Sequence, residues 1–317
     1  MPFLPTARLG PSDLVVSRIC FGGNVFGWTA DRDMSYSLLD NFFAAGGNFV
    51  DTADAYSAWV PGHSGGESER ILGSWMADRR NRDRMVVATK VGKKPGLENL
   101  RPETIRTACE ESLDRLQTDY IDLYYCHADD RDTPLGATLG ALAELVREGK
   151  VRYIAASNYE ADRLAEALRI SDELGAPRFV ALQPHFNLVH RQEYEGPLMR
   201  LCEREDISCL PYFALAAGFL TGKYRSAEIG DVARAPRVSG YASDHGWRVL
   251  AAVDEVAAAH GVSNAEVAIA WLMRQPTVAA PIASATSLPQ LEDVLGAAAL
   301  HLTDADFELL TAASQPD

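Results

Sequence analysis

Short β-rich runs alternate with longer helical patterns along the chain, and this order constrains the fold more than any other feature. Alternation of this kind is typical of βαβ units, in which crossover helices join parallel strands. Strands are expected at Arg18–Gly22, Asn48–Asp51, Met85–Lys90, Tyr120–His127, Arg152–Ser157, Phe179–Gln183, Ile207–Tyr212 and Val278–Ile282. Helices are expected at Asp33–Ala45, Glu67–Arg79, Pro102–Leu116, Leu135–Glu148, Glu160–Leu174 and Glu193–Arg204. The order predicts a single-domain (β/α)8 TIM barrel over residues 1–317, preceded by a short segment with a turn at Gly10–Asp13.

Length and charge narrow the class of protein further. A chain of 317 residues with 47% hydrophobic content suits one large barrel that needs neither metals nor disulfides for stability. The net charge of -14 argues against nucleic acid or an anionic membrane as a partner. Five cysteines without a C-x-x-C pair indicate free thiols in a reducing compartment. The beginning of the chain resembles neither a signal peptide nor a membrane span, so we expect a cytoplasmic protein.

Four chemically active side chains are expected to meet at one end of this barrel. Asp51, Lys90 and His127 end the second, third and fourth expected strands, and Tyr56 begins the loop after Asp51. Active sites of such barrels lie at the carboxyl ends of the strands. Taken singly, Asp51 and Lys90 could form a structural ion pair, His127 could be a core histidine and Tyr56 could pack a loop. Together they suit proton donation to a carbonyl group that receives a hydride.

Each of the four residues has a separate expected role. Tyr56 is the proton donor, and a tyrosine pKa of about 10 makes an unassisted phenol a slow acid at neutral pH. The ammonium of Lys90 is expected to lower the pKa of Tyr56, and Asp51 is expected to hold Lys90 in its charged form. His127 can donate a hydrogen bond that orients the carbonyl oxygen. The rival doubly wound dinucleotide fold would open with G-x-G-x-x-G, a pattern that this sequence lacks.

The motifs around these residues resemble those of the aldo-keto reductase superfamily. Residues 48–56 (NFVDTADAY) and 111–127 (ESLDRLQTDYIDLYYCH) are similar to its two most specific signatures. The similarity continues through Ser157-Asn158, residues 183–187, residues 212–224 and residues 283–296. Within the superfamily, the motifs most resemble the bacterial general-stress and potassium-channel β-subunit-like branch. The resemblance implies that Asp51, Tyr56, Lys90 and His127 are a catalytic tetrad.

The same resemblance implies a cofactor site for NADPH (NADP+), with NADH as the alternative. Ser157, Asn158 and Gln183 are assigned to the nicotinamide amide and Phe186 to stacking on its ring. The remaining implied cofactor residues are Gly22, Gly23, Asn24, Tyr212, Phe213, Ala214, Leu215, Gly218, Lys223, Arg237, Ser284, Thr286, Gln290 and Asp293. The chain departs from the family pattern at Ala214, Ser284 and Val294, which weakens the match at the adenine end.

Two long segments stand out as candidate functional loops, because long loops in compact domains often carry function. Residues 57–65 hold Trp59, and with Phe26 and Trp28 this side chain is expected to line the substrate pocket. Residues 221–246 hold Lys223 and Arg237, which are expected to wrap the pyrophosphate, although a mobile surface loop is the alternative. Ser287 and Gln290 also fit a capping box at the start of the helix after the last strand.

The sequence leaves three functions open. The leading expectation is an NADPH-dependent reductase that acts on a small-molecule carbonyl substrate. The alternatives are an NAD-dependent sugar or alcohol dehydrogenase and a regulatory subunit that retains the cofactor to sense redox state. No metal is expected, because no histidine lies in an H-E-x-x-H motif and His185 and His190 are five residues apart beside a proline.

Overall fold

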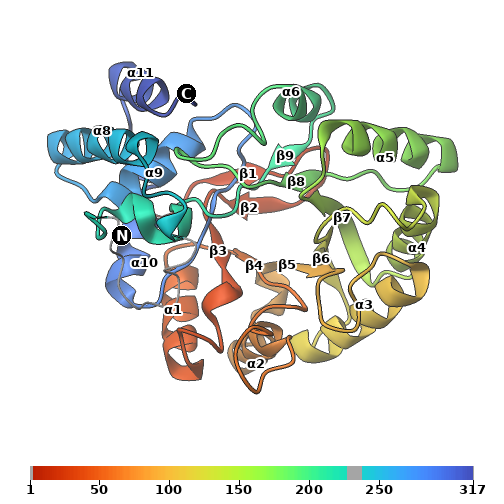
Figure 1. The fold of residues 1–317 in the computed structure, drawn as a ribbon. Coiled ribbons are helices and arrows are strands. Elements are labelled where there is room, and N and C mark those ends of the chain that lie inside the picture. The colour runs from red at the N-terminus through yellow and green to blue at the C-terminus, as the bar shows by residue number, and fades with distance from the viewer. Residues whose placement is uncertain (1–2, 227–237, 317) are drawn as a thin grey trace.

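The computed structural model describes residues 3–226 and 238–316, and its centre is an eight-stranded parallel sheet. The strand order is β10-β3-β4-β5-β6-β7-β8-β9, so each strand lies beside its neighbour in the chain (Figure 1). The strands are β3 (Cys20–Gly22), β4 (Phe49–Asp51), β5 (Val86–Val91), β6 (Ile121–Cys126), β7 (Val151–Ser157), β8 (Ala181–Gln183), β9 (Ser208–Cys209) and β10 (Ile282–Ala283). All eight expected strands are present, but β9 is shorter than expected and β10 begins at Ile282, where the expected strand ends.

Backbone hydrogen bonds join the two edges of this sheet. The N–H of Cys209 in β9 donates to the carbonyl of Thr277 at 2.8 Å, and the N–H of Ala279 donates back to Cys209 at 3.0 Å. The segment that contains Thr277 and Ala279 leads directly into β10. The sheet therefore curls into the single-domain (β/α)8 barrel that the sequence predicts.

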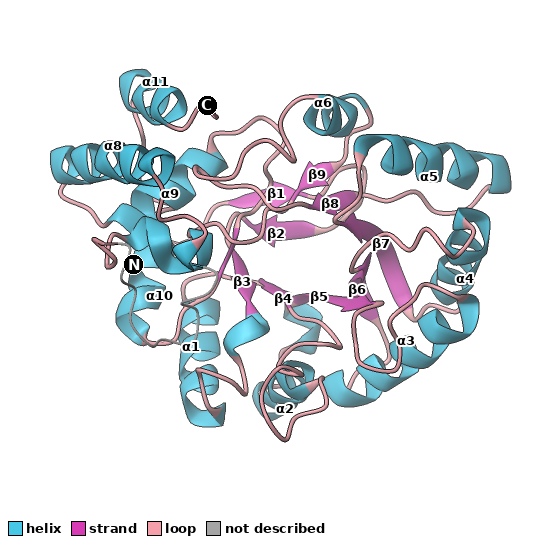
Figure 2. Ribbon diagram, in the orientation of Figure 1, coloured by secondary structure: helices cyan, strands magenta, loops and turns pink. Residues whose placement is uncertain are grey.

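Helices surround the strands on the outside of the barrel, as Figure 2 shows. They are α1 (Arg32–Ala44), α2 (Glu67–Arg79), α3 (Pro102–Leu116), α4 (Leu135–Arg147), α5 (Ala161–Leu174), α6 (Pro197–Arg204), α8 (Asp244–His260), α9 (Asn264–Met273), α10 (Leu288–Gly296) and α11 (Asp304–Ala313). The described chain also contains three short 3-10 helices, η1 (Gly23–Val25), η2 (Arg82–Arg84) and η3 (Ala216–Thr221). Within the described ranges, no helix has the length and apolarity needed to cross a membrane.

The hydrophobic core has two layers. The larger one fills the space between the strands and the helices, and includes Leu39, Trp75 and Trp271. The smaller one lies among the inward-facing side chains of the strands, and includes Phe49, Leu123 and further residues. All five cysteines are buried and unpaired, which confirms that the thiols are free.

A β-hairpin that the sequence pattern did not predict closes the bottom of the barrel. It consists of β1 (Thr6–Arg8) and β2 (Val15–Ser17), which pair antiparallel. Leu9, Leu14 and Val16 are buried in the inner core layer. Because each strand has only three residues, its alternation of apolar and polar residues is too short to be recognised as a strand pattern.

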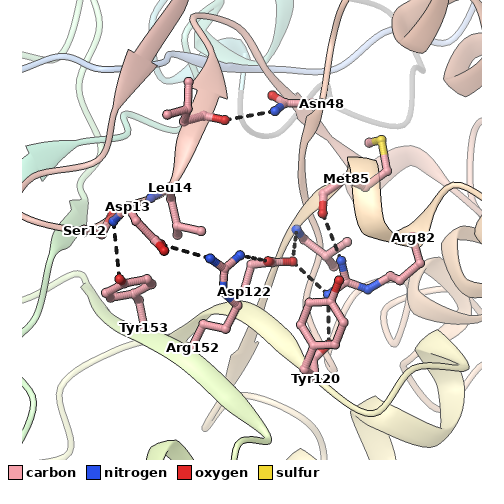
Figure 3. A network of polar contacts seen from close by, with 12 residues as sticks. Ser12, Asp13, Leu14, Asn48, Arg82, Met85, Tyr120, Asp122, Arg152 and Tyr153 are labelled. Carbon is pink, nitrogen blue, oxygen red and sulfur yellow. Dashed lines mark hydrogen bonds and ion pairs between the residues drawn. The ribbon is translucent and has the colours of Figure 1, made fainter.

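A network of charges links the exposed turn of the hairpin to the buried Asp122 at the amino-terminal ends of the strands (Figure 3). Asp122, near the start of β6, is 1% exposed and accepts hydrogen bonds from Arg82 and Arg152, each at 2.8 Å. Arg152 also pairs with Asp13 in the hairpin turn at 2.9 Å. A buried carboxylate needs such compensation, because an uncompensated buried charge is strongly destabilising. This end of the barrel is thereby fixed, and the opposite end carries the candidate site.

Candidate active site

The four predicted catalytic side chains meet at the carboxyl ends of three neighbouring strands. Asp51 is the last residue of β4, Lys90 is the penultimate residue of β5, and His127 follows β6 directly. Tyr56 lies in the tight turn after β4, where its N–H donates to the carbonyl of Ala53 at 3.2 Å. The parallel pairing of β4 with β5 and of β5 with β6 fixes the mutual positions of these strand ends.

Three of the four side chains are directly hydrogen-bonded to one another. The ammonium nitrogen Nζ of Lys90 lies 2.7 Å from Oδ2 of Asp51 and 2.9 Å from the phenol oxygen of Tyr56. The phenol also donates to Oδ2 of Asp51 at 3.0 Å. Lys90 completes its set of partners with the carbonyl of Thr52 at 2.7 Å. The lysine and the aspartate are buried, so this ion pair is held in a low-dielectric setting.

Burial dominates the acid–base properties of this cluster. Burial and the nearby Asp51 carboxylate raise the pKa of Tyr56 well above its ordinary value, whereas the sequence analysis expected Lys90 to lower it. Burial also lowers the pKa of Lys90, against the opposing effect of Asp51. The protonated phenol is therefore the stable form at neutral pH, as a proton donor requires. The Lys90 ammonium contacts the phenol oxygen, where negative charge would develop when the proton leaves.

His127 is a neutral imidazole beside this cluster. Its ring centre lies 6.1 Å from that of Tyr56 in an edge-on arrangement. Burial, together with the positive charges of Lys90 and Lys93, lowers the pKa of His127 well below its ordinary value. Its Nδ1 atom is buried without a hydrogen-bond partner among the described residues. A neutral imidazole carries one N–H, so His127 can donate one hydrogen bond into the site.

The cluster lies at one side of a cavity of about 890 Å³. Most residues that the sequence analysis assigned to the site line it: Asn24, Asp51, Tyr56, Trp59, His127, Ser157, Asn158, Gln183, Tyr212, Phe213, Ala214, Leu215, Gly218, Lys223, Ser284, Gln290 and Asp293. A cavity of this size suits a ligand larger than most single metabolites. Ala217 and Thr221, which belong to segments expected to wrap the pyrophosphate, line it too, whereas sequence reasoning missed Ala55, Ala58, Lys93, Pro95, Ala265, Ile282 and Ala283.

A chain of polar side chains connects the cluster to the far wall of the cavity. The side-chain amide of Gln183 donates to Oδ1 of Asp51 at 2.8 Å, and the Ser157 hydroxyl donates to the backbone carbonyl of Gln183 at 2.9 Å. The amide of Asn158 donates to Ser157 at 2.9 Å and accepts from the phenol of Tyr212 at 2.8 Å. These residues hold one another in defined rotamers at the wall of the cavity.

Phe186 does not reach the cavity, which corrects its predicted role as the stacking ring. Its side chain is fully buried against Tyr194 and Trp271, with ring centres 5.0 and 5.6 Å away. The aromatic ring that lines the cavity on this side is the half-buried Tyr212, just after β9, which also stacks on His185 with ring centres 5.3 Å apart. Both residues follow strands in the sequence, and only the packing distinguishes the core ring from the cavity ring.

Several other assigned residues lie outside the cavity lining. Phe26 is fully buried in the outer core layer. Trp28 packs edge-on against Trp59, with the two ring centres 5.5 Å apart. Gly22, Gly23 and Thr286 do not line the cavity. Gly22 is required for close packing, because a Cβ there would lie 2.5 Å from the hydroxyl of Ser284. Arg237 lies outside the described residues.

The loop after β9 has a backbone shape suited to an anion. Phe213, Ala216 and Ala217 have φ between 48° and 56°, and Gly218 has a φ of 102°. Non-glycine residues in this left-handed region carry strain that commonly marks functional sites. A Cβ on Gly218 would lie 3.3 Å from the Lys223 ammonium, so the glycine lets that cation approach the backbone. The loop and Lys223 together fit the pyrophosphate of a dinucleotide.

The amino-terminal end of α10 forms the remaining wall. The expected capping box is not formed, because the Ser287 side chain makes no capping hydrogen bond. The side-chain oxygen of Gln290 instead accepts from the backbone N–H of Thr286 at 2.9 Å. The first backbone N–H groups of α10 therefore have no hydrogen bond from a side-chain cap. Such a helix start is a favourable place for a phosphate. Asp293, one turn later, has a pKa raised chiefly by burial.

A histidine pair outside the cavity has the composition of a metal site but not the geometry of one. Ligand atoms of His185, His190 and Glu193 lie within 4.8 Å of one another. The two imidazole rings stack face to face, with centres 3.6 Å apart and planes inclined by 12°. Lone pairs in parallel ring planes do not converge on one ion, since a metal ligand must point at the metal in the plane of its ring.

Comparisons with known proteins identify a family that matches most of the chain. The family model described as "Aldo/keto reductase family" matches residues 18–315. The chain is 32% identical to Protein tas of Escherichia coli (strain K12), with 94% of each chain covered. It is 32% identical to norsolorinic acid reductase B of Aspergillus parasiticus, with 99% of this chain and 83% of the relative covered. It is 30% identical to the aldo-keto reductase str7 of Strobilurus tenacellus, with 95% and 89% covered.

Proposed function

The chain belongs to the aldo/keto reductase family, and from this premise we propose that it is an NADPH-dependent reductase that converts aldehydes or ketones to alcohols. In this proposal Tyr56 is the general acid, Lys90 and Asp51 set its proton affinity, and His127 orients the carbonyl. The observation that carries the proposal is the contact of the Tyr56 phenol with both Lys90 and Asp51 at the edge of the large cavity.

The chemistry divides between the cofactor and the chain. When bound, a reduced nicotinamide supplies the hydride for the carbonyl carbon. His127 donates a hydrogen bond to the carbonyl oxygen, and Tyr56 passes its proton to the same oxygen as negative charge develops there. The ammonium of Lys90, 2.9 Å away, stabilises the phenolate that remains. The buried setting strengthens each of these interactions.

Turnover experiments test the proposal directly. Loss of NADPH absorbance is measured with a panel of aldehydes and ketones, and single-turnover mixing measures the hydride-transfer step alone. The reductase is supported by carbonyl-dependent oxidation of NADPH. A chain that binds NADPH tightly but transfers hydride to no member of the panel would instead be a redox-sensing subunit. Parallel titrations with NADPH and NADH by fluorescence quenching distinguish the phosphorylated from the unphosphorylated cofactor.

We expect Tyr212→Ala to weaken NADPH binding by about tenfold, because the loss of an aromatic face removes about 1 kcal/mol or more of stacking. Phe186→Leu should instead lower the free energy of unfolding by about 1–3 kcal/mol, since this ring packs the core. Fluorescence titration and urea denaturation of both variants separate the two roles. If Phe186→Leu reduced cofactor affinity more than Tyr212→Ala did, the stacking role would belong to Phe186.

We expect Lys223→Ala to weaken NADPH binding and to speed its release. Lys223 lies beside the backbone of Gly218, where it can contact the pyrophosphate. Charge-assisted hydrogen bonds contribute about 1.5–3 kcal/mol, so a loss of about tenfold in affinity is expected, or less where the ammonium stays hydrated. Stopped-flow dissociation at two salt concentrations measures the effect. Unchanged release rates would remove Lys223 from the cofactor site.

A further inference from the structure

The cavity contains a lysine for which neither the fold nor the proposed reaction gives a role. Lys93 lies in the loop after β5 and lines the cavity. Its neighbour Lys94 pairs with Glu111, whereas Lys93 is exposed and makes no hydrogen bond or ion pair with the rest of the described chain. Lys93 is close enough to His127 for its charge to lower the histidine pKa. The ammonium group therefore lies within electrostatic reach of the proposed carbonyl position.

An aromatic wall lies on the same side of the cavity. Trp59, in the loop after β4, is 45% exposed and also lines the cavity. Its ring makes edge-on contacts with Trp28 at 5.5 Å and Tyr56 at 6.2 Å, which fix its orientation. Pro95, in the same loop as Lys93, and Ala58 add apolar surface. Large exposed apolar side chains around a few polar groups are typical of ligand sites.

Charge and shape on this side together define a class of substrate. The loops after β4, β5 and β6 are neighbours, so Trp59, Lys93 and His127 surround one space. Of the charged groups that line the cavity in the described chain, Lys223 and Asp293 belong to the segments after β9 and β10, and Asp51 forms an ion pair with Lys90. An anion on the substrate would give Lys93 the partner that the protein does not provide.

We propose that this enzyme selects aromatic carbonyl compounds that carry an anionic group, with the ring on Trp59 and the anion on Lys93. The proposal rests on the proposed function, because it places the carbonyl between Tyr56 and His127. Trp59 supplies affinity for the ring, and Lys93 discriminates anionic from neutral substrates of the same shape. An aliphatic neutral carbonyl uses neither feature.

Matched pairs of substrates test the role of Lys93. The three isomers of formylbenzoate and their methyl esters are compared by kcat/KM in the wild type, Lys93→Met and Lys150→Met. At least one acid should exceed its ester by about tenfold in the wild type, and Lys93→Met should abolish this ratio. Lys150 pairs with Glu110 and Glu148 on the surface, so Lys150→Met controls for the loss of one charge and should keep the ratio. An acid-to-ester ratio that Lys93→Met does not change would overturn the proposal.

A binding measurement keeps this test separate from the proposed function. Benzoate is titrated into the NADP+-loaded protein, with isothermal titration calorimetry as the readout. Lys93→Met should weaken benzoate binding by about tenfold, and equal affinities would contradict the proposal whether or not any aldehyde is reduced. Trp59→Ala should weaken benzoate binding more than acetate binding, because only benzoate has a ring. Failure of every aldehyde to oxidise NADPH would refute the reductase and leave the Lys93 result standing on binding alone.

Discussion

Replacing Tyr56 with phenylalanine is expected to lower the rate of hydride transfer by at least about a hundredfold, because the variant lacks the proton donor. The cavity keeps its shape, since phenylalanine retains the ring and loses only the hydroxyl. NADPH affinity should therefore stay within a few-fold of the wild type. Single-turnover kinetics measure the rate, and fluorescence titration measures the affinity.

A second tyrosine provides the matched control for this experiment. Tyr124 in β6 is fully buried on the helix-facing side, and its hydroxyl has no hydrogen-bond partner within the described chain. Tyr124→Phe makes the same chemical change and should leave turnover near the wild-type level. If Tyr56→Phe reduced NADPH binding as strongly as it reduced turnover, Tyr56 would be a structural residue of the cavity wall.

The barrel could be predicted from the sequence because its signals are local. Each strand is a short apolar run with a helical pattern after it, and the predicted bounds of α2 and α3 match the observed bounds, Glu67–Arg79 and Pro102–Leu116. The meeting of Asp51, Lys90 and His127 also follows from local order, because all three close or follow strands of one parallel sheet. The predicted start of α6 at Glu193 is wrong, because the helix begins at Pro197 after the turn at Gly196.

What the sequence could not predict depends on long-range packing. Phe186 and Tyr212 both follow strands, yet Phe186 is buried by Trp271, a residue of the distant α9. The direction of the Tyr56 pKa shift also depends on burial, since the same Lys90 contact would lower that pKa in a more hydrated site. Lys93 carried no motif, and only its place in the cavity and its lack of a protein partner single it out.

Replacing Lys90 with methionine should also lower hydride transfer by at least about a hundredfold, for a different reason. The phenol of Tyr56 loses the ammonium 2.9 Å away that stabilises its ionised form. The pKa of Tyr56, which burial and Asp51 already raise, should therefore rise further. In the oxidative direction the phenolate must accept the proton, so the rate of alcohol oxidation increases as pH rises through this pKa. The acidic limb of that profile should accordingly move to higher pH in the variant.

Stability must be separated from chemistry in this variant, because Lys90 is the partner of the buried Asp51 carboxylate at 2.7 Å. Leaving such a charge unpaired costs about 3–5 kcal/mol, and the single variant can fail to fold for that reason alone. The double variant Asp51→Asn/Lys90→Met removes both charges, and the introduced amide oxygen can still accept the hydrogen bond that Gln183 donates to Asp51. Urea denaturation should show that the double variant is more stable than Lys90→Met. Because the neighbouring carboxylate is also lost, its oxidative pH profile should shift less than that of Lys90→Met while the rate stays low. An acidic limb that stays at the wild-type pH in a folded Lys90→Met protein would show that Lys90 does not control the ionisation of Tyr56.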